Sequence, residues 1–228
     1  NDGTPGRVYR GVDMLNLGGP PAWETPLIVQ VSRWDTLKDP LGVLAGFARL
    51  MASAPELHAD LVLAGPNVRA VADDPDGARV FDQVASAFRA LPHHVRRHVH
   101  LANIPTADVE ENAAIVNALQ RHATIVVQKS LREGFGLTVT EAMWKGRPIV
   151  ASRVGGIVDQ IEDGVDGLLV RDPRDLDSFA AALRSLLQDP ERARSLGAHA
   201  AIRARDHFLG LRHLLDYGTL LERIDGRE

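Results

Sequence analysis

Two glutamates flank a glycine turn near the middle of the chain, and their types and spacing could do chemistry. Glu133 precedes the turn that contains Gly134 and Gly136, and Glu141 follows it. The β-branched run at residues 124–127 has the length of a buried parallel strand, and glycines let the backbone approach a ligand closely. A helix after the turn would offer free N–H groups to an anion such as phosphate. The pattern predicts a strand, a glycine turn and a helix, with the Glu141 carboxylate leaning back toward an anion site and Glu133 on its other side.

Two cations lie in another loop, after the apolar run at residues 27–32. Arg33 offers a planar fork of donors and Lys38 a point charge, and together they suit a diphosphate. A plainer interpretation is a solvated loop in which Arg33 pairs with Asp35, or Lys38 with Asp39, at little gain in stability. Both interpretations stay open on the residues alone.

Apolar strands alternate with helices along the chain, which predicts the fold class. Strands are expected at residues 27–32, 61–64, 99–101, 124–128, 148–151 and 167–170, and helices at 41–51, 78–90, 108–121, behind the glycine turn, at 175–188 and at 190–207. Strands without polar alternation indicate a parallel sheet covered on both faces. We therefore expect an α/β, Rossmann-like doubly wound parallel sheet of about six strands. Ligands of such sheets bind at the carboxyl ends of the strands, near a topological switch point.

The composition disfavours several functional classes. The 228 residues have a formal net charge of -4 and a pI near 6.1, so no broad basic field attracts nucleic acid. The absence of cysteine removes disulfides, thiolate zinc sites and cysteine nucleophiles. No apolar run is long enough to span a membrane and no secretory signal is expected, so a cytoplasmic location is the default.

Histidines and acidic turns could suggest a metal site, but their spacing does not support one. His93, His94, His98 and His100 surround a short expected strand, where surface or capping roles are expected. The acidic turn at residues 73–77 lacks the further oxygen ligands of a calcium loop. We expect no metal site.

The usual nucleotide fingerprints are missing. The first expected strand is followed by Ser32, Arg33 and Trp34 instead of G-x-G-x-x-G, and the chain has no P-loop. This disfavours a nicotinamide oxidoreductase. Phosphate would have to be held by fixed cations and helix ends.

The run EGFGLTVTEAMWKGRPIV, followed by ASRVGGIVDQIEDGVDGLLV, resembles retaining glycosyltransferases of the GT-B fold, and more narrowly the trehalose-forming synthases of glycosyltransferase family 4. The loop S-R-W-D-x-x-K-D matches the family as well. The resemblance implies that Arg33 and Lys38 bind the diphosphate of a nucleotide sugar, that Glu133 holds hydroxyls of the donor sugar, and that Glu141 holds the ribose. Further donor-binding positions implied by the motif are Gly134, Phe135, Gly136, Leu137 and Thr138.

The family works with two Rossmann-like domains, and the resemblance covers only the C-terminal one. Residues 1–26 are then the linker or edge of a missing N-terminal domain, and residues 27–228 the nucleotide-sugar-binding domain with C-terminal helices. The implied function is transfer of glucose from a nucleoside diphosphate glucose, with no other cofactor, to an acceptor held by the missing domain. Glucose is the expected acceptor, giving trehalose, and the chain alone is expected to be inactive.

Some alternatives stay open at this point. A retaining trehalose phosphorylase would use the same cations for inorganic phosphate, and a non-catalytic module would bind nucleotide without activity. The residues do not distinguish ADP, UDP and GDP. Gln128 and Ser130 are expected near the donor pocket, whereas Lys129 and Arg132 could equally lie on the surface.

Overall fold

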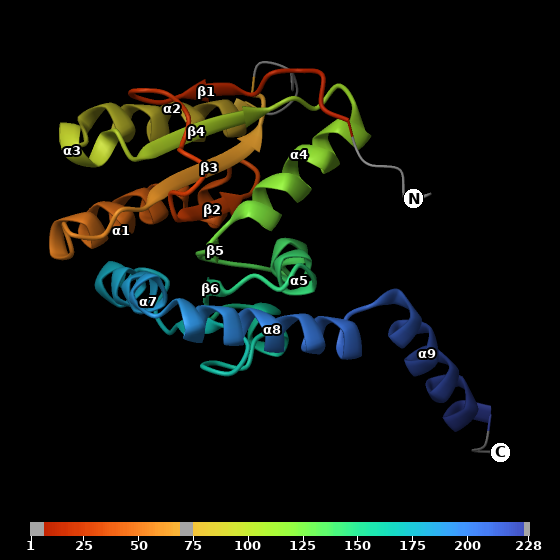
Figure 1. Ribbon diagram of the computed structural model, residues 1–228. Helices are drawn as coiled ribbons and strands as arrows, with labels where there is room; N and C mark the ends of the chain where they lie inside the picture. Colours follow the sequence, from red (N-terminus) through yellow and green to blue (C-terminus); the bar gives the residue numbers. More distant parts are fainter. Residues whose placement is uncertain (1–6, 69–74, 226–228) are drawn as a thin grey trace.

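A computed structural model describes residues 7–68 and 75–225, which form a sheet flanked by helices (Figure 1). The described residues contain seven strands in the order β1-β4-β3-β2-β5-β6-β7. The strands are β1 (Asp13–Leu15), β2 (Leu27–Val31), β3 (Asp60–Pro66), β4 (Val99–Ile104), β5 (Ile125–Gln128), β6 (Ile149–Ser152) and β7 (Leu168–Val170). All six strands that the sequence predicts are present and parallel, which confirms the doubly wound sheet.

The seventh strand, β1, was not predicted because it lies in a stretch rich in glycine and proline. It pairs antiparallel with β4, with Asp13 opposite Asn103 and Leu15 opposite Leu101. Three residues without a sustained apolar period leave no readable strand pattern. β1 therefore forms because the edge of β4 is available for backbone pairing.

The helices follow the expected alternation. They are η1 (Thr36–Lys38, a 3-10 turn), α1 (Pro40–Ser53), α2 (Pro75–Ala90), α3 (His93–Arg96), α4 (Val109–His122), α5 (Leu137–Trp144), α6 (Ile157–Gln160), α7 (Leu176–Gln188), α8 (Pro190–His207) and α9 (Gly210–Asp225). Aspartate side chains accept N–H bonds at the starts of several helices, including Asp175 on α7 and Asp108 on α4. Of the acidic turn, residues 73 and 74 lie outside the described residues, and Asp76 lies in the first turn of α2.

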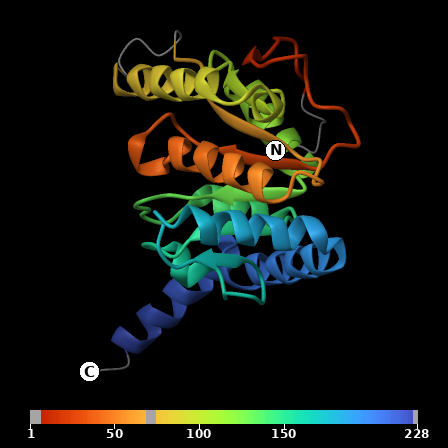
Figure 2. The same cartoon turned by 90° about the vertical axis from the view of Figure 1, so that its left-hand side faces the viewer.

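Two apolar clusters cover the two faces of the sheet (Figure 2). Phe47 of α1 and Phe179 of α7 belong to one cluster, and Met143 of α5 belongs to the other. α8 contributes to both, with Leu196 in the first and Ala200 in the second. Because α8 runs past the β7 side of the sheet, it joins the two layers.

α9 extends away from the sheet in both ribbon views (Figures 1 and 2). Several of its apolar side chains are exposed, among them Leu214 and Leu221. No helix within the described residues is both long and apolar enough to cross a bilayer.

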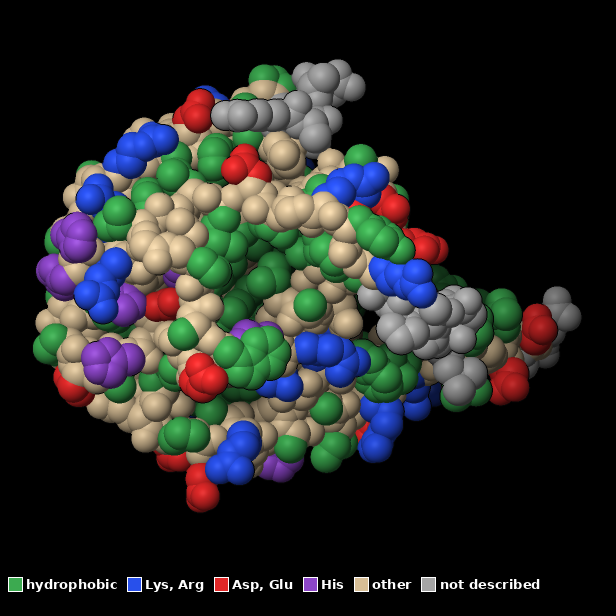
Figure 3. Space-filling model, turned by 45° about the horizontal axis from the view of Figure 1, so that its top comes forward, with side chains coloured by type: hydrophobic (Ala, Val, Ile, Leu, Met, Phe, Trp, Pro, Cys, Tyr) green, Lys and Arg blue, Asp and Glu red, His purple; other side chains and the backbone are tan. Residues whose placement is uncertain are grey.

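Several histidine side chains lie on the left in Figure 3, the side on which Figure 1 shows α3. His100 lies inside β4 and is almost fully buried, so the expectation of a surface or capping role is wrong for this residue. The Asp60 carboxylate compensates for the burial of the His100 ring, because it contacts His100 Nε2 at 3.2 Å. It also contacts His98 Nδ1 at 2.7 Å. Within the described residues no group of histidines and carboxylates has the arrangement of a metal site.

The direction in which the chain adds strands to the sheet reverses after β4, and the parallel neighbours β2 and β5 mark the point of reversal. The chain moves from β2 outward through β3 to β4, and then returns to pair β5 with β2, Ile28 lying opposite Ile125. This is the switch point of a doubly wound sheet, where the loops that follow β2 and β5 separate and leave a crevice.

Candidate functional site

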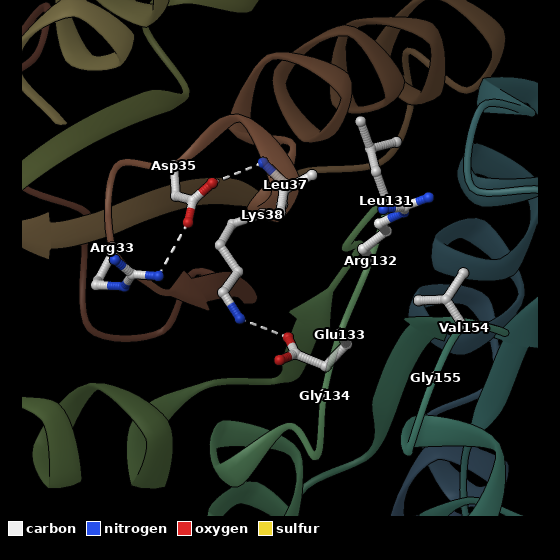
Figure 4. A pocket seen from close by; sticks show the side chains of 10 residues that line it. All are labelled: Arg33, Asp35, Leu37, Lys38, Leu131, Arg132, Glu133, Gly134, Val154 and Gly155. Atoms are coloured by element: carbon white, nitrogen blue, oxygen red, sulfur yellow. Dashed lines mark hydrogen bonds and ion pairs between the residues drawn. The ribbon is translucent and has the colours of Figure 1, made fainter. Parts of the chain in front are cut away.

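A cavity of about 650 Å³ opens at the carboxyl ends of β2, β5 and β6 (Figure 4). Its lining combines two cations and a carboxylate of the predicted site with apolar and glycine positions. The lining residues are Arg33, Asp35, Leu37, Lys38, Leu131, Arg132, Glu133, Gly134, Val154 and Gly155. The cavity thus joins the two loops that the sequence singled out.

Lys38 and Glu133 face each other across this cavity (Figure 4). The Lys38 Nζ atom lies 2.5 Å from the Glu133 Oε2 atom, and the side chains are only 19% and 9% exposed. An ion pair with this little solvent contact is screened less than a surface pair. The alternative pairing of Lys38 with Asp39, left open by the sequence, is not the one that forms.

The Glu133 carboxylate is held from β5 as well. Gln128 donates from Nε2 to Glu133 Oε2 at 3.2 Å, and the Ser130 hydroxyl donates to the same oxygen at 3.1 Å. Thr138 donates to Gln128 Oε1 at 2.8 Å, which turns the amide nitrogen of Gln128 toward Glu133. Gln128 and Ser130 therefore orient the acid, and Thr138, whose predicted donor contact stays a prediction, orients Gln128.

Arg33 turns toward Asp35 in the structure (Figure 4). Its Nη2 atom lies 3.0 Å from Asp35 Oδ2, and the Arg33 side chain is 69% exposed. Asp35 also caps η1 by accepting the Leu37 N–H at 2.8 Å. Arg33 thus forms the loop ion pair with Asp35 that the plainer interpretation expected. Because Arg33 also lines the cavity, its exposed side chain can reach a ligand there.

A second glycine turn, after β6, supports the turn that bears Glu133. Gly156 donates its N–H to the Gly134 carbonyl at 2.8 Å. Gly155 has a φ of 51°, and a Cβ built there would overlap the Glu133 carbonyl oxygen. Only glycine meets both demands without strain, so the two turns are packed backbone to backbone.

Of residues 134–138, which run from the glycine turn into α5, only Gly134 lines the cavity. Gly136, with a φ of 84°, begins the helix without any side-chain cap, as a strand-turn-helix junction predicts. Phe135 is half exposed and lies edge-on to Phe208, and Leu137 is exposed.

Glu141 also stands apart from the cavity wall. It accepts a bond from Gln120 of α4 at 3.3 Å and is exposed on α5. Lys145 contacts the same Gln120, and burial lowers the pKa of Lys145 below its ordinary value. Of the predicted site residues, the structure brings together Arg33, Lys38, Glu133 and Gly134 in one wall, and leaves Phe135, Gly136, Leu137, Thr138 and Glu141 behind it.

Lys129 and Arg132, which the sequence left undecided, have opposite environments. Arg132 lines the cavity, whereas Lys129 is fully buried and forms an ion pair with Asp39. Strand alternation could have indicated this, because Gln128 and Ser130 on one face of the extended chain place Lys129 on the other.

The cavity wall contains three cations and a hydrogen-bonded carboxylate. Arg33, Lys38 and Arg132 suit an anion, and Glu133 can accept hydroxyl donors. The arrangement can bind a ligand that has both an anionic part and a polyhydroxylated part.

Known proteins are similar to this chain in sequence over most of its length. Over 203 residues the chain is 39% identical to a trehalose synthase of Rubrobacter xylanophilus, covering 89% of this chain and 45% of the relative. It is 30% identical to a trehalose phosphorylase of Pleurotus pulmonarius over 78% of this chain and 24% of that protein. The chain therefore spans less than half the length of these curated relatives.

Solved structures share the fold. A sucrose-phosphate synthase from Thermosynechococcus elongatus superposes with a TM-score of 0.69 at 25% identity, covering 91% of this chain and 47% of the other. An Anabaena protein, HepE, solved in complex with UDP-glucose, superposes with a TM-score of 0.68 at 19% identity over 88% and 49% of the two chains, a likeness that bears on the fold alone. The α/β domain thus corresponds to one half of a GT-B structure.

The family model described as "Glycosyl transferases group 1" matches residues 21–203. The match covers β2 to β7 and the site between them. The chain belongs to the group 1 glycosyl transferase family.

Proposed function

We propose that the chain is the donor-binding half of a retaining glycosyltransferase that transfers glucose from a nucleoside diphosphate glucose to an acceptor, with glucose as the acceptor and trehalose as the product. Family membership and the 39% identity to a trehalose synthase support the reaction class. Residues 27–228 form the donor domain in this proposal, and residues 1–26 lead in from a domain that binds the acceptor.

The Lys38–Glu133 pair is the observation that supports this proposal most directly. It places a cation and a carboxylate side by side at the switch point of the sheet. A nucleotide sugar has a diphosphate next to a ring of hydroxyls, so one ligand can satisfy both charges. Lys38 and Arg33 then bind the diphosphate, and Glu133 accepts hydroxyl bonds from the sugar.

The other predicted positions have supporting roles in this proposal. Backbone N–H groups from Gly134 to Thr138, at the start of α5, face the phosphates. Glu141 exchanges its contact with Gln120 for the ribose hydroxyls. Phe135 is kept in place by Phe208.

The chemistry in this proposal is departure of a nucleoside diphosphate from the anomeric carbon. Negative charge grows on the leaving diphosphate, and Lys38 and Arg33 stabilise it. Glu133 orients the sugar and forms no covalent intermediate. The acceptor is positioned by the partner domain, so this chain alone should bind donor without transferring sugar.

A phosphorylase is the second candidate, favoured by the 30% identity to a trehalose phosphorylase. In that reaction, the same cations would hold inorganic phosphate. Nucleotide would then have no role.

The test is calorimetry on the 228-residue chain with ADP, UDP and GDP, each with and without attached glucose, and with inorganic phosphate plus trehalose. Tighter binding of a glucose conjugate than of glucose alone, together with competition by the matching diphosphate, is the expected result. Binding of phosphate with trehalose and of none of the nucleotides would establish the phosphorylase instead. Binding of nucleoside diphosphates without binding of any glucose conjugate would favour a non-catalytic module.

A further inference from the structure

A second ion pair, between Lys129 and Asp39, adjoins the cavity-lining residues along the chain. Lys129 follows the last residue of β5 and is fully buried, and its Nζ atom contacts Asp39 Oδ2 and lies 5.8 Å from the centre of the Phe179 ring. Removing an ammonium group from water is costly unless a partner charge is fixed in place. A buried lysine so close to a polar cavity therefore needs a structural reason.

This pair connects the same two loops as the Lys38–Glu133 pair. Asp39 is the neighbour of Lys38 along the chain, and Lys129 begins the loop that leads to Glu133. A backbone bond from Leu131 N–H to the Leu37 carbonyl, 2.8 Å long, adds to the connection. The Lys38–Glu133 pair (the cavity pair) and the Lys129–Asp39 pair (the buried pair) thus link the same two loops.

The backbone around the buried pair is arranged to accommodate it. Asp39 has a φ of 50°, the one positive value for a residue other than glycine in the described part of the chain. Its second oxygen caps α1 by accepting the Gly42 N–H at 3.1 Å. A Cβ at Gly42 would collide with both Asp39 and Lys129, so α1 leaves space for the pair at this position.

The two links differ in what a ligand does to them. If Lys38 turns to a diphosphate and Glu133 to sugar hydroxyls, the cavity pair no longer holds the loops together. Lys129 is not in the cavity wall, and its pairing with Asp39 is unaffected by such a ligand. Two loops that must clamp two ends of one ligand then keep their spacing through the buried pair together with the Leu131–Leu37 backbone bond.

We propose that Lys129 and Asp39 are positioning residues, a buried pair that keeps Lys38 and Glu133 at the spacing of a nucleotide sugar while the ligand replaces their own contact. This inference rests on the proposed function for its ligand. The spacing itself is a property of the protein and can be measured without one.

The test compares Lys129→Met, Asp39→Asn and the double variant, which leaves no unpaired buried charge and keeps an oxygen to cap α1. The double variant should fold, since uncharged replacements of a buried pair are often tolerated. It should bind the glucose conjugate about ten-fold or more weakly, with the bare nucleoside unchanged. A double variant that regains both parental stability and parental affinity for the conjugate would assign the pair to folding alone and overturn the proposal.

A ligand-free measurement separates this proposal from the proposed function. Unfolding in urea of Lys38→Met, Glu133→Gln and their combination gives the coupling between the two side chains. We expect a coupling of about three-fold or more in the unfolding constant of the parent, and none in the Lys129→Met/Asp39→Asn background.

The exposed pair Arg49–Asp177, which links α1 to α7, provides the matched control. Arg49→Met/Asp177→Asn should leave the Lys38–Glu133 coupling intact. Undiminished coupling without the buried pair would overturn the positioning role, even if no nucleotide binds to the parent. Failure of nucleotide binding together with lost coupling would contradict only the proposed function.

Discussion

Both ends of the parallel strands carry buried or half-buried charges, and the two ends use them differently. At the carboxyl end, Lys38 and Glu133 meet beside a cavity of about 650 Å³. At the amino end, the two oxygens of Asp60 are occupied by His98 and His100, and its side chain is 9% exposed. A charge beside open space can exchange its partner for a ligand, whereas one enclosed by its partners serves the fold. A buried charge is therefore not by itself evidence of a site.

The electrostatics of the amino end follow from this enclosure. Burial alone would raise the pKa of Asp60, but hydrogen bonds from His100 and His98 outweigh it and hold that pKa below its ordinary value. The ionised carboxylate is thus the form that the fold stabilises.

The largest effect is expected from Gly155→Ala, which should disrupt the carboxyl end alone. A methyl group would overlap the Glu133 carbonyl at a φ of 51°, and we expect the free energy of unfolding to fall by about 2 to 5 kcal/mol. Urea unfolding measures this. Gly164→Ala is the matched control, because its φ is 80° and nothing lies within 4 Å, so it should lose only about 1 to 2 kcal/mol. Equal losses would show that steric support of the Glu133 turn is unimportant.

Lys38→Met should affect ligand binding more than folding. We expect binding of a nucleoside diphosphate to weaken by roughly 1.5 to 3 kcal/mol, because a charge-assisted contact is lost, and binding of the bare nucleoside to stay the same. Arg33→Met should weaken the diphosphate by less, about 1 kcal/mol or below, because Arg33 is 69% exposed and shared with Asp35. Calorimetry on both variants provides the comparison. A larger loss for Arg33→Met would reverse the two roles.

Glu133→Gln tests whether the Glu133 carboxylate exchanges its contact with Lys38 for the hydroxyls of a sugar. The glucose conjugate should bind more weakly by about 1 to 3 kcal/mol, since the sugar hydroxyls lose a charged acceptor. The nucleoside diphosphate should not bind more weakly, because Lys38 no longer has a competing carboxylate. Calorimetry with matched ligands measures both. If the two ligands weaken equally, Glu133 orients the loop and does not clamp the sugar.

The smallest effect is expected at the amino end, from Asp60→Asn. At neutral pH the variant should lose about 1 to 2 kcal/mol of stability, because the histidine bonds lose their charge assistance, and its ligand binding should be unchanged. Since the folded pKa of Asp60 is lowered, the extra stability of the parent is present above about pH 3.9 and disappears as the pH falls through the folded value. Urea unfolding from neutral to acid pH measures the difference. A difference that grows toward low pH would contradict the assignment.

The six parallel strands were largely readable from the sequence, because apolar runs bounded by glycine, proline and polar residues mark buried parallel strands. The three residues of β1 were not, since their place depends on the edge of β4. The burial of His100 was also missed, because its partner Asp60 lies forty residues away in the chain and only the pairing of β3 with β4 brings them together.

The site was predicted in its outline but not in its contacts. Loops after β2 and β5 were expected at one crevice, and Arg33, Lys38 and Glu133 do line one cavity. That Lys38 pairs with Glu133 instead of Asp39 depends on side-chain directions across two loops, which no local pattern encodes. The donor roles of these residues and of Glu141 remain predictions.

The pairing of β2 with β5 has a consequence for the order of events during folding. The Leu27 N–H donates to Thr124 Oγ1 across 97 positions of the chain, and this junction joins the first half of the sheet to the second. Closing so long a loop costs entropy that grows with the logarithm of its length, so contacts within each half are expected to form sooner. Lys38 belongs to the first half and Glu133 to the second. We therefore expect that ligand affinity appears only in the last stage of folding, and that a stopped-flow binding signal would report completion of the sheet.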